Sequence, residues 1–265
     1  MRKDHRPYFI KSLENKVVTW YADKYLRPQF LSLGKSLMTV RPWHITVFGY
    51  NVKLGDYATI LAEPDNKVNL VSWAQSDFKE LSEIITSSAK KMDDPEDEKQ
   101  WEGTGSIEIG DYALICPGVR IQAATRIAIG HGVMIAQRVY ITDSDWHGIY
   151  NRCMPVGTTR PVTIGNNVWI GDGAMVCKGV TIGDNSIIGA GAVVSRDVPQ
   201  NCIAAGNPAT VVKHLDPDIP ITGREVMFKN YRSTWDTLDA VDRDVHKANT
   251  FGGWLRHIVA PRWGD

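Results

Sequence analysis

Aliphatic residues recur every six positions through the middle of this chain. Reading from Ile164, the sequence divides into IGNNVW, IGDGAM, VCKGVT, IGDNSI, IGAGAV and VSRDVP, each opening with isoleucine or valine. The second position of each hexapeptide is small, and the fifth is small or compact. The same frame occurs from Ile109, from Ile129 and, further upstream, from Phe48. This period matches neither the 3.6-residue helical turn nor a heptad, so a helix would scatter these side chains around its surface.

The six-residue period suits a solenoid in which each hexapeptide forms one short strand and one turn. Three hexapeptides would make a triangular coil, with the aliphatic side chain pointing inward and a small residue where the backbone bends. A β-sandwich would instead show an irregular period of about 8–12 residues. The pattern therefore predicts a mainly β protein, a parallel β-helix whose stacked coils bury a column of isoleucine and valine.

The repeats and their interruptions divide the chain into five parts. We expect an N-terminal helical cap, early coils, a helical and acidic insertion, the main β-helix and an aromatic C-terminal tail, at residues 1–40, 41–72, 73–104, 105–213 and 214–265. The insertion contains an amphipathic helix over residues 77–91 and an acidic run at 93–99, which is typical of a solvated loop. The main β-helix is interrupted by a loop at 147–163.

Composition narrows the function classes. The chain has 265 residues, with 30 lysines and arginines balanced by 30 aspartates and glutamates, so no net positive field favours a nucleic-acid partner. No apolar run reaches the roughly 18 residues of a membrane span, and the polar start MRKDHRPYF does not resemble a signal peptide. The four cysteines are scattered and form no CxxC pair. These features predict a cytoplasmic protein with no membrane span.

The repeat, the run IGNNVWIGDGAMV and the closing AAGNPATVVK together resemble the hexapeptide-repeat acetyltransferases, in the galactoside, maltose and polysaccharide O-acetyltransferase branch. The resemblance is strong over residues 105–215 and weak over 40–72. It implies a left-handed coil and a homotrimer with active sites between subunits. It also implies that acetyl-CoA is the co-substrate and that the acetyl group passes to a hydroxyl of a sugar-like or lipid-linked acceptor.

The repeat is interrupted after ITDSDW by the segment HGIYNRCMPVGTTRPVT, which begins at His147. In the related enzymes a histidine opens the corresponding loop, so the resemblance implies that His147 is the general base. An alcohol must lose its proton as it attacks a thioester, and a histidine can accept that proton. Asp143, Asp145 or a backbone carbonyl would hold the imidazole in one tautomer.

The later coils are expected to hold CoA. The turn at Asp172 would supply a backbone N–H for the oxyanion, which places Asp172 in the catalytic set. Trp169 resembles the family tryptophan beside the thioester. The other implied contacts are small residues that let pantetheine approach and polar residues that meet the nucleotide phosphates: Gly171, Gly173, Ala190, Gly191, Ser195, Arg196 and Lys213.

The acceptor is less well defined. Cys116 stands where galactoside-type members have an asparagine that contacts the sugar, and a thiol is a weaker hydrogen-bond partner than an amide. A galactoside or maltose acceptor is therefore disfavoured, and a surface-polysaccharide precursor is expected instead. Further acceptor contacts are predicted in the loop region, although the same residues also suit a purely structural role: Asp143, Asp145, Trp146, Tyr150 and Arg152.

Two alternatives remain at this point, and a third, a zinc site, is disfavoured. An N-acetyltransferase acting on an amino sugar or nucleotide sugar would use the same fold, and a β-helix scaffold without activity would retain the repeats. A zinc site like that of the γ-type carbonic anhydrases would need a third histidine besides His131 and His147, but none occurs between His147 and His214. No metal is therefore expected.

Overall fold

The aliphatic column predicted from the repeat forms the core of the protein. The structure, a computed structural model, describes residues 4–88 and 103–260. Every first-position residue from Ile164 to Val194 is at most 2% exposed, and the fifth-position residues from Val168 to Val198 are at most 5% exposed. Trp169, at a sixth position, points outward and is 48% exposed. The predicted mainly β class and the stacked parallel coils are confirmed.

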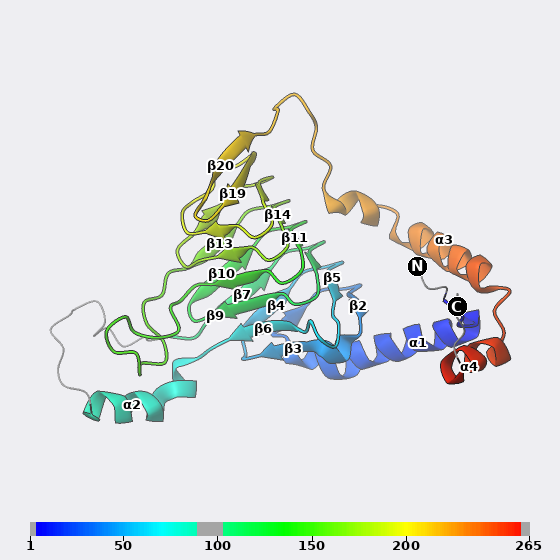
Figure 1. Ribbon diagram of the computed structural model, residues 1–265, viewed down its shortest axis with the longest axis horizontal. Helices are drawn as coiled ribbons and strands as arrows, with labels where there is room; N and C mark the ends of the chain where they lie inside the picture. The colour runs from blue at the N-terminus through cyan, green and yellow to red at the C-terminus, as the bar shows by residue number, and fades with distance from the viewer. Residues whose placement is uncertain (1–3, 89–102, 261–265) are drawn as a thin grey trace.

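Three sheets form the faces of the β-helix (Figure 1). Sheet 1 contains β1 (Ser32–Leu33), β4 (Val52–Leu54), β7 (Ser106–Ile109), β10 (Arg126–Ile129), β13 (Val162–Ile164) and β16 (Thr181–Ile182). Sheet 2 contains β2 (Met38–Val40), β5 (Thr59–Leu61), β8 (Leu114–Ile115), β11 (Met134–Ile135), β14 (Trp169–Ile170), β17 (Ile187–Ile188), β19 (Cys202–Gly206) and β20 (Ala209–His214). Sheet 3 contains β3 (Ile45–Phe48), β6 (Val68–Ser72), β9 (Arg120–Ala123), β12 (Tyr140–Thr142), β15 (Met175–Val176) and β18 (Val193–Val194).

The chain visits the three sheets in turn, so each circuit makes one coil and pairs in parallel with the coil before it. The exception is β20, which pairs antiparallel with β19 and ends the solenoid. A side-chain ladder also joins the turns between sheets 1 and 2. The N–H of His131 donates to Asn166 Oδ1 at 2.8 Å, and the N–H of Asn166 donates to Asp184 Oδ1 at 2.6 Å. Below them, the Asp111 N–H donates to His131 Nδ1 at 3.0 Å.

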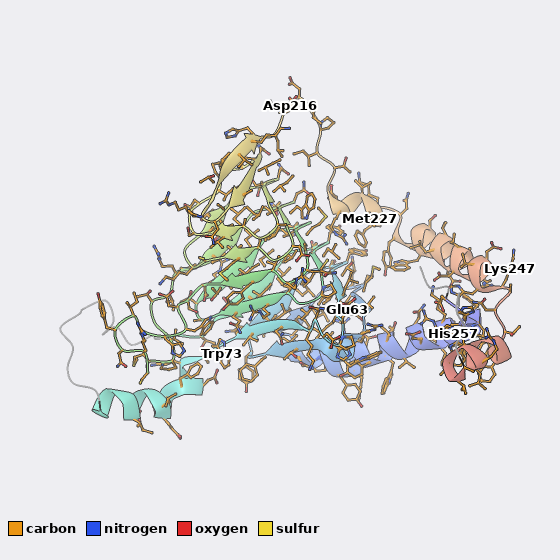
Figure 2. All side chains as sticks on the ribbon, in the orientation of Figure 1. Glu63, Trp73, Asp216, Met227, Lys247 and His257 are labelled. Carbon is orange, nitrogen blue, oxygen red and sulfur yellow. The ribbon has the colours of Figure 1, made fainter. Side chains whose placement is uncertain are left out.

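Both long interruptions of the repeat leave the coil at the same corner, between sheet 3 and sheet 1. The first follows β6 and contains η4 (Gln75–Phe78) and α2 (Lys79–Ser88). The second, residues 143–161, follows β12 and carries His147. Rings from the two interruptions pack together, with the Trp73 and Trp146 centroids 6.1 Å apart. Figure 2 labels Trp73 where the coil leads into α2.

The remaining helices lie in the two terminal segments, except for η3, which lies between β2 and β3 of the first coil. They are α1 (Tyr8–Tyr21), the short turns η1 (Ala22–Leu26), η2 (Arg27–Gln29) and η3 (Pro42–His44), then η5 (Arg224–Phe228), α3 (Tyr231–His246) and α4 (Phe251–Val259). Figure 1 shows α1, α3 and α4 near both ends of the chain. Within residues 4–88 and 103–260, no helix has the length and apolar character that a bilayer crossing requires.

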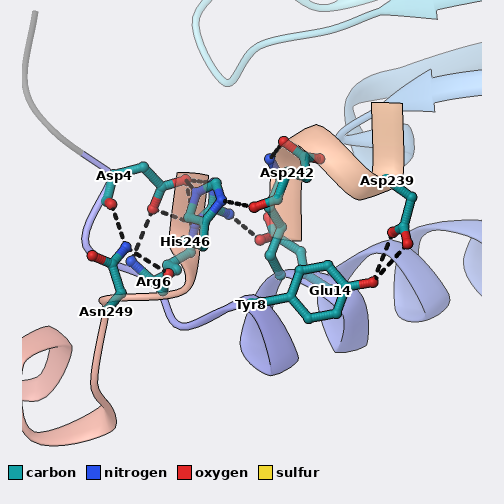
Figure 3. A network of polar contacts seen from close by, with 9 residues as sticks. Asp4, Arg6, Tyr8, Glu14, Asp239, Asp242, His246 and Asn249 are labelled. Atoms are coloured by element: carbon teal, nitrogen blue, oxygen red, sulfur yellow. Dashed lines mark hydrogen bonds and ion pairs between the residues drawn. The ribbon is translucent and has the colours of Figure 1, made fainter. Parts of the chain in front are cut away.

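Polar contacts tie the two ends of the chain together (Figure 3). Asn249 Nδ2 donates to the backbone carbonyls of Asp4 and Arg6, at 2.7 and 2.9 Å. The buried His246 lies with Nε2 3.3 Å from Asp4 Oδ2. Tyr8 Oη donates to Asp239 at 2.7 Å, so the N-terminal segment is bound along α3.

Two details differ from the sequence expectation. The first coil begins at Ser32, inside the segment predicted as the cap, because β1 pairs with β4 although its sequence lacks the hexapeptide pattern. Phe48 is 47% exposed and packs on Trp73 instead of entering the core, so the upstream frame takes effect only from Val52 and Leu54. The acidic run at 93–99 lies outside the described residues.

Candidate active site

The loop that carries His147 is closed at its base by a short antiparallel stem. The Asp145 N–H donates to the Thr158 carbonyl at 3.0 Å, and the Gly157 N–H donates to the Asp145 carbonyl at 2.8 Å. One step closer to the coil, the Arg160 N–H donates to the Asp143 carbonyl at 2.8 Å. His147 follows this stem directly, so its backbone starts from a fixed position while its side chain is exposed.

Asp143 holds the corner from which the loop departs. Its fully buried carboxylate accepts from the Ala124 N–H at 2.7 Å, the Thr125 N–H at 2.8 Å and Thr125 Oγ1 at 3.0 Å. Burial raises the pKa of Asp143, and the N–H donors oppose that rise by favouring the charged form. Because both oxygens are occupied inside the protein, we withdraw Asp143 as an acceptor contact and as a partner of His147.

Asp145 braces the stem from the other side. Its Oδ2 accepts from Thr158 Oγ1 at 2.9 Å and also binds the Lys178 ammonium, which contacts Thr158 as well. Lys178 comes from the coil above the loop, and its side chain is only 17% exposed. Asp145 therefore stabilises the base of the loop, and no hydrogen bond among the described residues joins its carboxylate to the His147 ring.

Trp146 anchors the start of the loop tip. Its indole Nε1 donates to Tyr140 Oη at 2.8 Å, and Tyr140 Oη donates to Gln122 Oε1 at 2.8 Å. Together with the ring contact to Trp73, these bonds give Trp146 a structural role at the corner. Tyr150 and Arg152 lie further along the same loop as His147, and both are exposed.

The predicted CoA contacts around Trp169 and Gly191 lie at a different corner, between sheets 2 and 3. Trp169 faces outward on β14 of sheet 2, next to Ile187 of the following coil, and the Asp172 turn comes after β14. Asp172 accepts two hydrogen bonds from Arg138 Nη2, both 2.9 Å. Ala190 and Gly191 occupy the equivalent turn one coil later, and both are exposed.

The backbone donors of the Asp172 turn are largely used by the coil. The Gly171 N–H donates to the Ile188 carbonyl and the Gly173 N–H to the Gln137 carbonyl, each at 2.8 Å. The Asp172 N–H makes no hydrogen bond with any described residue, so it is the donor of this turn that remains for an oxyanion. Gly173 and Gly191 have φ of +66° and +67° with open space beyond their Cα atoms.

Ser195, Arg196 and Lys213 are exposed at the last coil, near the end of the solenoid. Lys213 lies on β20 opposite Ile203 of β19. Cys116 lies at the lower end of the corner between sheets 2 and 3, on the coil of β8, and is half-buried. Burial is the main reason that the pKa of the Cys116 thiol is raised; Arg224 lowers it in part and Asp172 raises it further.

The predicted site is divided between two corners of one chain, and Ser195 and Arg196 lie at the same corner as His147, several coils further along. His147 projects between sheets 3 and 1, whereas Trp169, Asp172 and Cys116 line the corner between sheets 2 and 3. Two residues near these groups were not identified from the sequence, Lys178 and Arg224. Lys178 has the sequence context of an ordinary turn residue in VCKGVT, and Arg224 lies in the tail, 112 residues after the Tyr112 that it contacts.

Comparisons with known proteins find sequences that share the hexapeptide repeat. Residues 161–196 match the family described as bacterial transferase hexapeptide (six repeats). The polysialic acid O-acetyltransferase of Escherichia coli O1:K1 / APEC is 46% identical over 89 residues, covering 33% of this chain and 29% of that protein. The galactoside O-acetyltransferase of Escherichia coli (strain K12) is 39% identical over 108 residues, covering 40% of this chain and 51% of that protein.

A crystal structure of a maltose O-acetyltransferase from Clostridium difficile 630 aligns with 73% of this chain and 78% of that chain, at 26% identity and a TM-score of 0.37. Across the curated relatives, this chain spans between 29% and 62% of the relative's own length. The coils and the matched segment define a parallel β-helix built from hexapeptide repeats. Residues 161–196 are thus similar to the hexapeptide-repeat transferases, and the curated relatives that match this chain include O-acetyltransferases.

Proposed function

We propose that this protein transfers an acetyl group from acetyl-CoA to a hydroxyl of a sugar or surface-polysaccharide precursor, with His147 as general base. The observation that carries the proposal is the braced stem. In an otherwise regular coil, Asp143, Asp145 and Lys178 hold the base of a loop that carries an exposed histidine. Loops fixed on rigid scaffolds are common places for catalytic residues.

The chemistry follows from that placement. The imidazole takes the proton of the acceptor hydroxyl as the oxygen attacks the thioester carbonyl, and the carbon–sulfur bond then breaks. The proton passes to the departing CoA thiolate, so the products are the acetyl ester and free CoA thiol. The Asp172 N–H would stabilise the transient oxyanion. No covalent acyl-enzyme is needed.

We further propose that the site forms between protomers of a homotrimer. The separation of His147 from Trp169 and Cys116 supports this, because a neighbouring copy would bring one corner against the other. The small turn residues around Gly191 suit an extended pantetheine, and Arg196 with Lys213 suit the nucleotide phosphates. We also propose a cytoplasmic location, where acetyl-CoA is available.

An amino sugar or nucleotide sugar as acceptor, with transfer to nitrogen, is the second candidate. The same histidine geometry would serve an amine, and the half-buried thiol of Cys116 does not favour a neutral sugar hydroxyl over an amine. A scaffold without activity is the third candidate. The panel of acceptors below separates all three.

The test is acetyl-CoA turnover by thiol release, with hydroxyl sugars, amino sugars and nucleotide sugars as acceptors. We expect acceptor-dependent release that falls by about two to four orders of magnitude in His147→Ala. His131→Asn is the matched control, because Asn166 already fills the equivalent ladder position with an asparagine. Equal loss in both variants, or turnover that survives in His147→Ala, would remove His147 from the mechanism.

A further inference from the structure

The C-terminal tail returns along the coil and docks beside the predicted acceptor position. After β20, the chain runs back to η5, where Figure 2 labels Met227. The rings of Tyr57 and Tyr112 stack 5.6 Å apart at an interplanar angle of 6°. Phe228 lies 5.6 and 5.5 Å from them, and Tyr231 lies 5.2 Å from Tyr57. These rings fix the position of η5 on the lower coils.

This docking places the Arg224 guanidinium on the outer face of sheet 2. Arg224 Nε donates to the Tyr112 carbonyl at 2.8 Å, and Nη2 donates to Thr59 Oγ1 at 3.3 Å. Thr59 pairs with Leu114 across neighbouring strands. Successive strand residues alternate between faces, so Leu114 and Cys116 share the outward side while the intervening Ile115 is buried. Arg224 therefore lies on the face that carries Cys116.

The charge of Arg224 has no carboxylate partner among the described residues. Both of its hydrogen-bond acceptors are neutral, whereas Arg138 and Lys178 each form an ion pair. The guanidinium is half-buried, and burial lowers the pKa of Arg224. A partly desolvated cation is costly without a counter-charge, and a neutral donor would tie the tail to Tyr112 equally well. Three of the five guanidinium N–H donors make no hydrogen bond with any described residue and are available to a ligand.

An anion at this point would belong to the acceptor rather than to CoA. Arg224 sits at the coils of β5 and β8, whereas Ser195 and Arg196 follow β18, three coils above β9. Adjacent strands are about 4.8 Å apart, so the two ends are separated by roughly 14 Å. Resting on the proposed function, which it refines, we propose that Arg224 binds a carboxylate or phosphate of the acceptor, which is therefore an acidic sugar.

The experiment compares galactose, galacturonate and galactose 6-phosphate as acceptors for wild type, Arg224→Gln and Arg224→Lys. We expect the KM of the preferred acid to rise about 10- to 100-fold in Arg224→Gln with kcat changed less than about threefold, and Arg224→Lys to recover part of the loss. Galactose kinetics should not change. Lys229→Gln, which removes an equal charge beside η5, is the matched control. The two acids distinguish a carboxylate from a phosphate acceptor.

Two further measurements keep the outcomes separate. Hydrogen exchange across α3 reports whether the tail stays docked in each variant, so a KM change with unaltered exchange is a direct effect on binding. Calorimetric titration of galacturonate and galactose 6-phosphate measures binding without turnover. Arg224-dependent binding of an acid without acetyl transfer would uphold this inference and refute the proposed function. Turnover with no preference for acids, or an equal KM change for galactose, would overturn the inference alone.

Discussion

Replacing Asp143 by asparagine tests whether the buried carboxylate holds the corner from which the loop departs. In the native protein Oδ1 accepts the Ala124 N–H, and Oδ2 accepts both the Thr125 N–H and hydroxyl. An amide has one oxygen, so one buried backbone N–H loses its acceptor, at a cost of about 1–3 kcal/mol. Removing a buried charge offsets part of this. We expect a net loss of about 1–2 kcal/mol in the free energy of unfolding.

Asp184→Asn is the matched control, since it makes the same chemical change at a site that uses one oxygen. Asp184 Oδ1 accepts the Asn166 N–H, and Asn166 itself fills the same role for His131. We expect this variant to lie within about 0.5 kcal/mol of wild type. Both variants are compared by urea unfolding at pH 7, with the slope checked for two-state behaviour. A loss in Asp143→Asn no larger than that in Asp184→Asn would refute the corner role.

Two further predictions concern the loop and the tied ends. In Gly157→Ala, the new Cβ would lie 2.4 Å from the His147 carbonyl oxygen, so the loop must shift and we expect kcat to fall at least about 10-fold. The control is Gly252→Ala, whose site is open, and we expect the two variants to have similar thermal stability. An unchanged kcat in Gly157→Ala would contradict this prediction. Arg6 holds the pKa of Asp4 well below its usual range, so this carboxylate stabilises the docked N-terminal segment above the unfolded pKa of about 4 and loses that effect as pH falls. Hydrogen-exchange protection near His246 in the wild type should hold from pH 7 to 5 and decline below about 4. Asp4→Asn should show the lower protection at every pH. Equal protection in the wild type and Asp4→Asn at every pH would contradict this prediction.

The coil was predictable because its information is local. The first position of each hexapeptide identifies the residue that points inward, and Ile170, Val176 and Ile182 at that position are all fully buried. The outward direction of Trp169 follows from the same frame. The break in the repeat, which is also a local signal, points to His147, and its catalytic role stays a prediction.

The environment of the site was not predictable, because it depends on contacts between distant segments. Asp143 is at the third position of its hexapeptide, which the frame does not direct inward, and only the fold shows that it is buried with Ala124 and Thr125 on its two oxygens. Arg224 meets Tyr112 across a separation of 112 residues, and nothing in the tail sequence specifies that docking. The early start of the coil at Ser32 was missed because strand pairing, not a repeat, defines it.

The register of the coil explains how such a loop can be carried at little cost to the core. Equivalent turn positions are 18 residues apart from Asn166 to Asp184 but 35 apart from His131 to Asn166, because the loop intervenes. The ladder bond is retained across both intervals, and β14 still pairs in register with β11. The inserted segment therefore leaves the strand pairing on either side intact. Changes at Gly157 or in the loop tip should then alter catalysis without unfolding the coil, whereas changes at Asp143 act on the corner that both share.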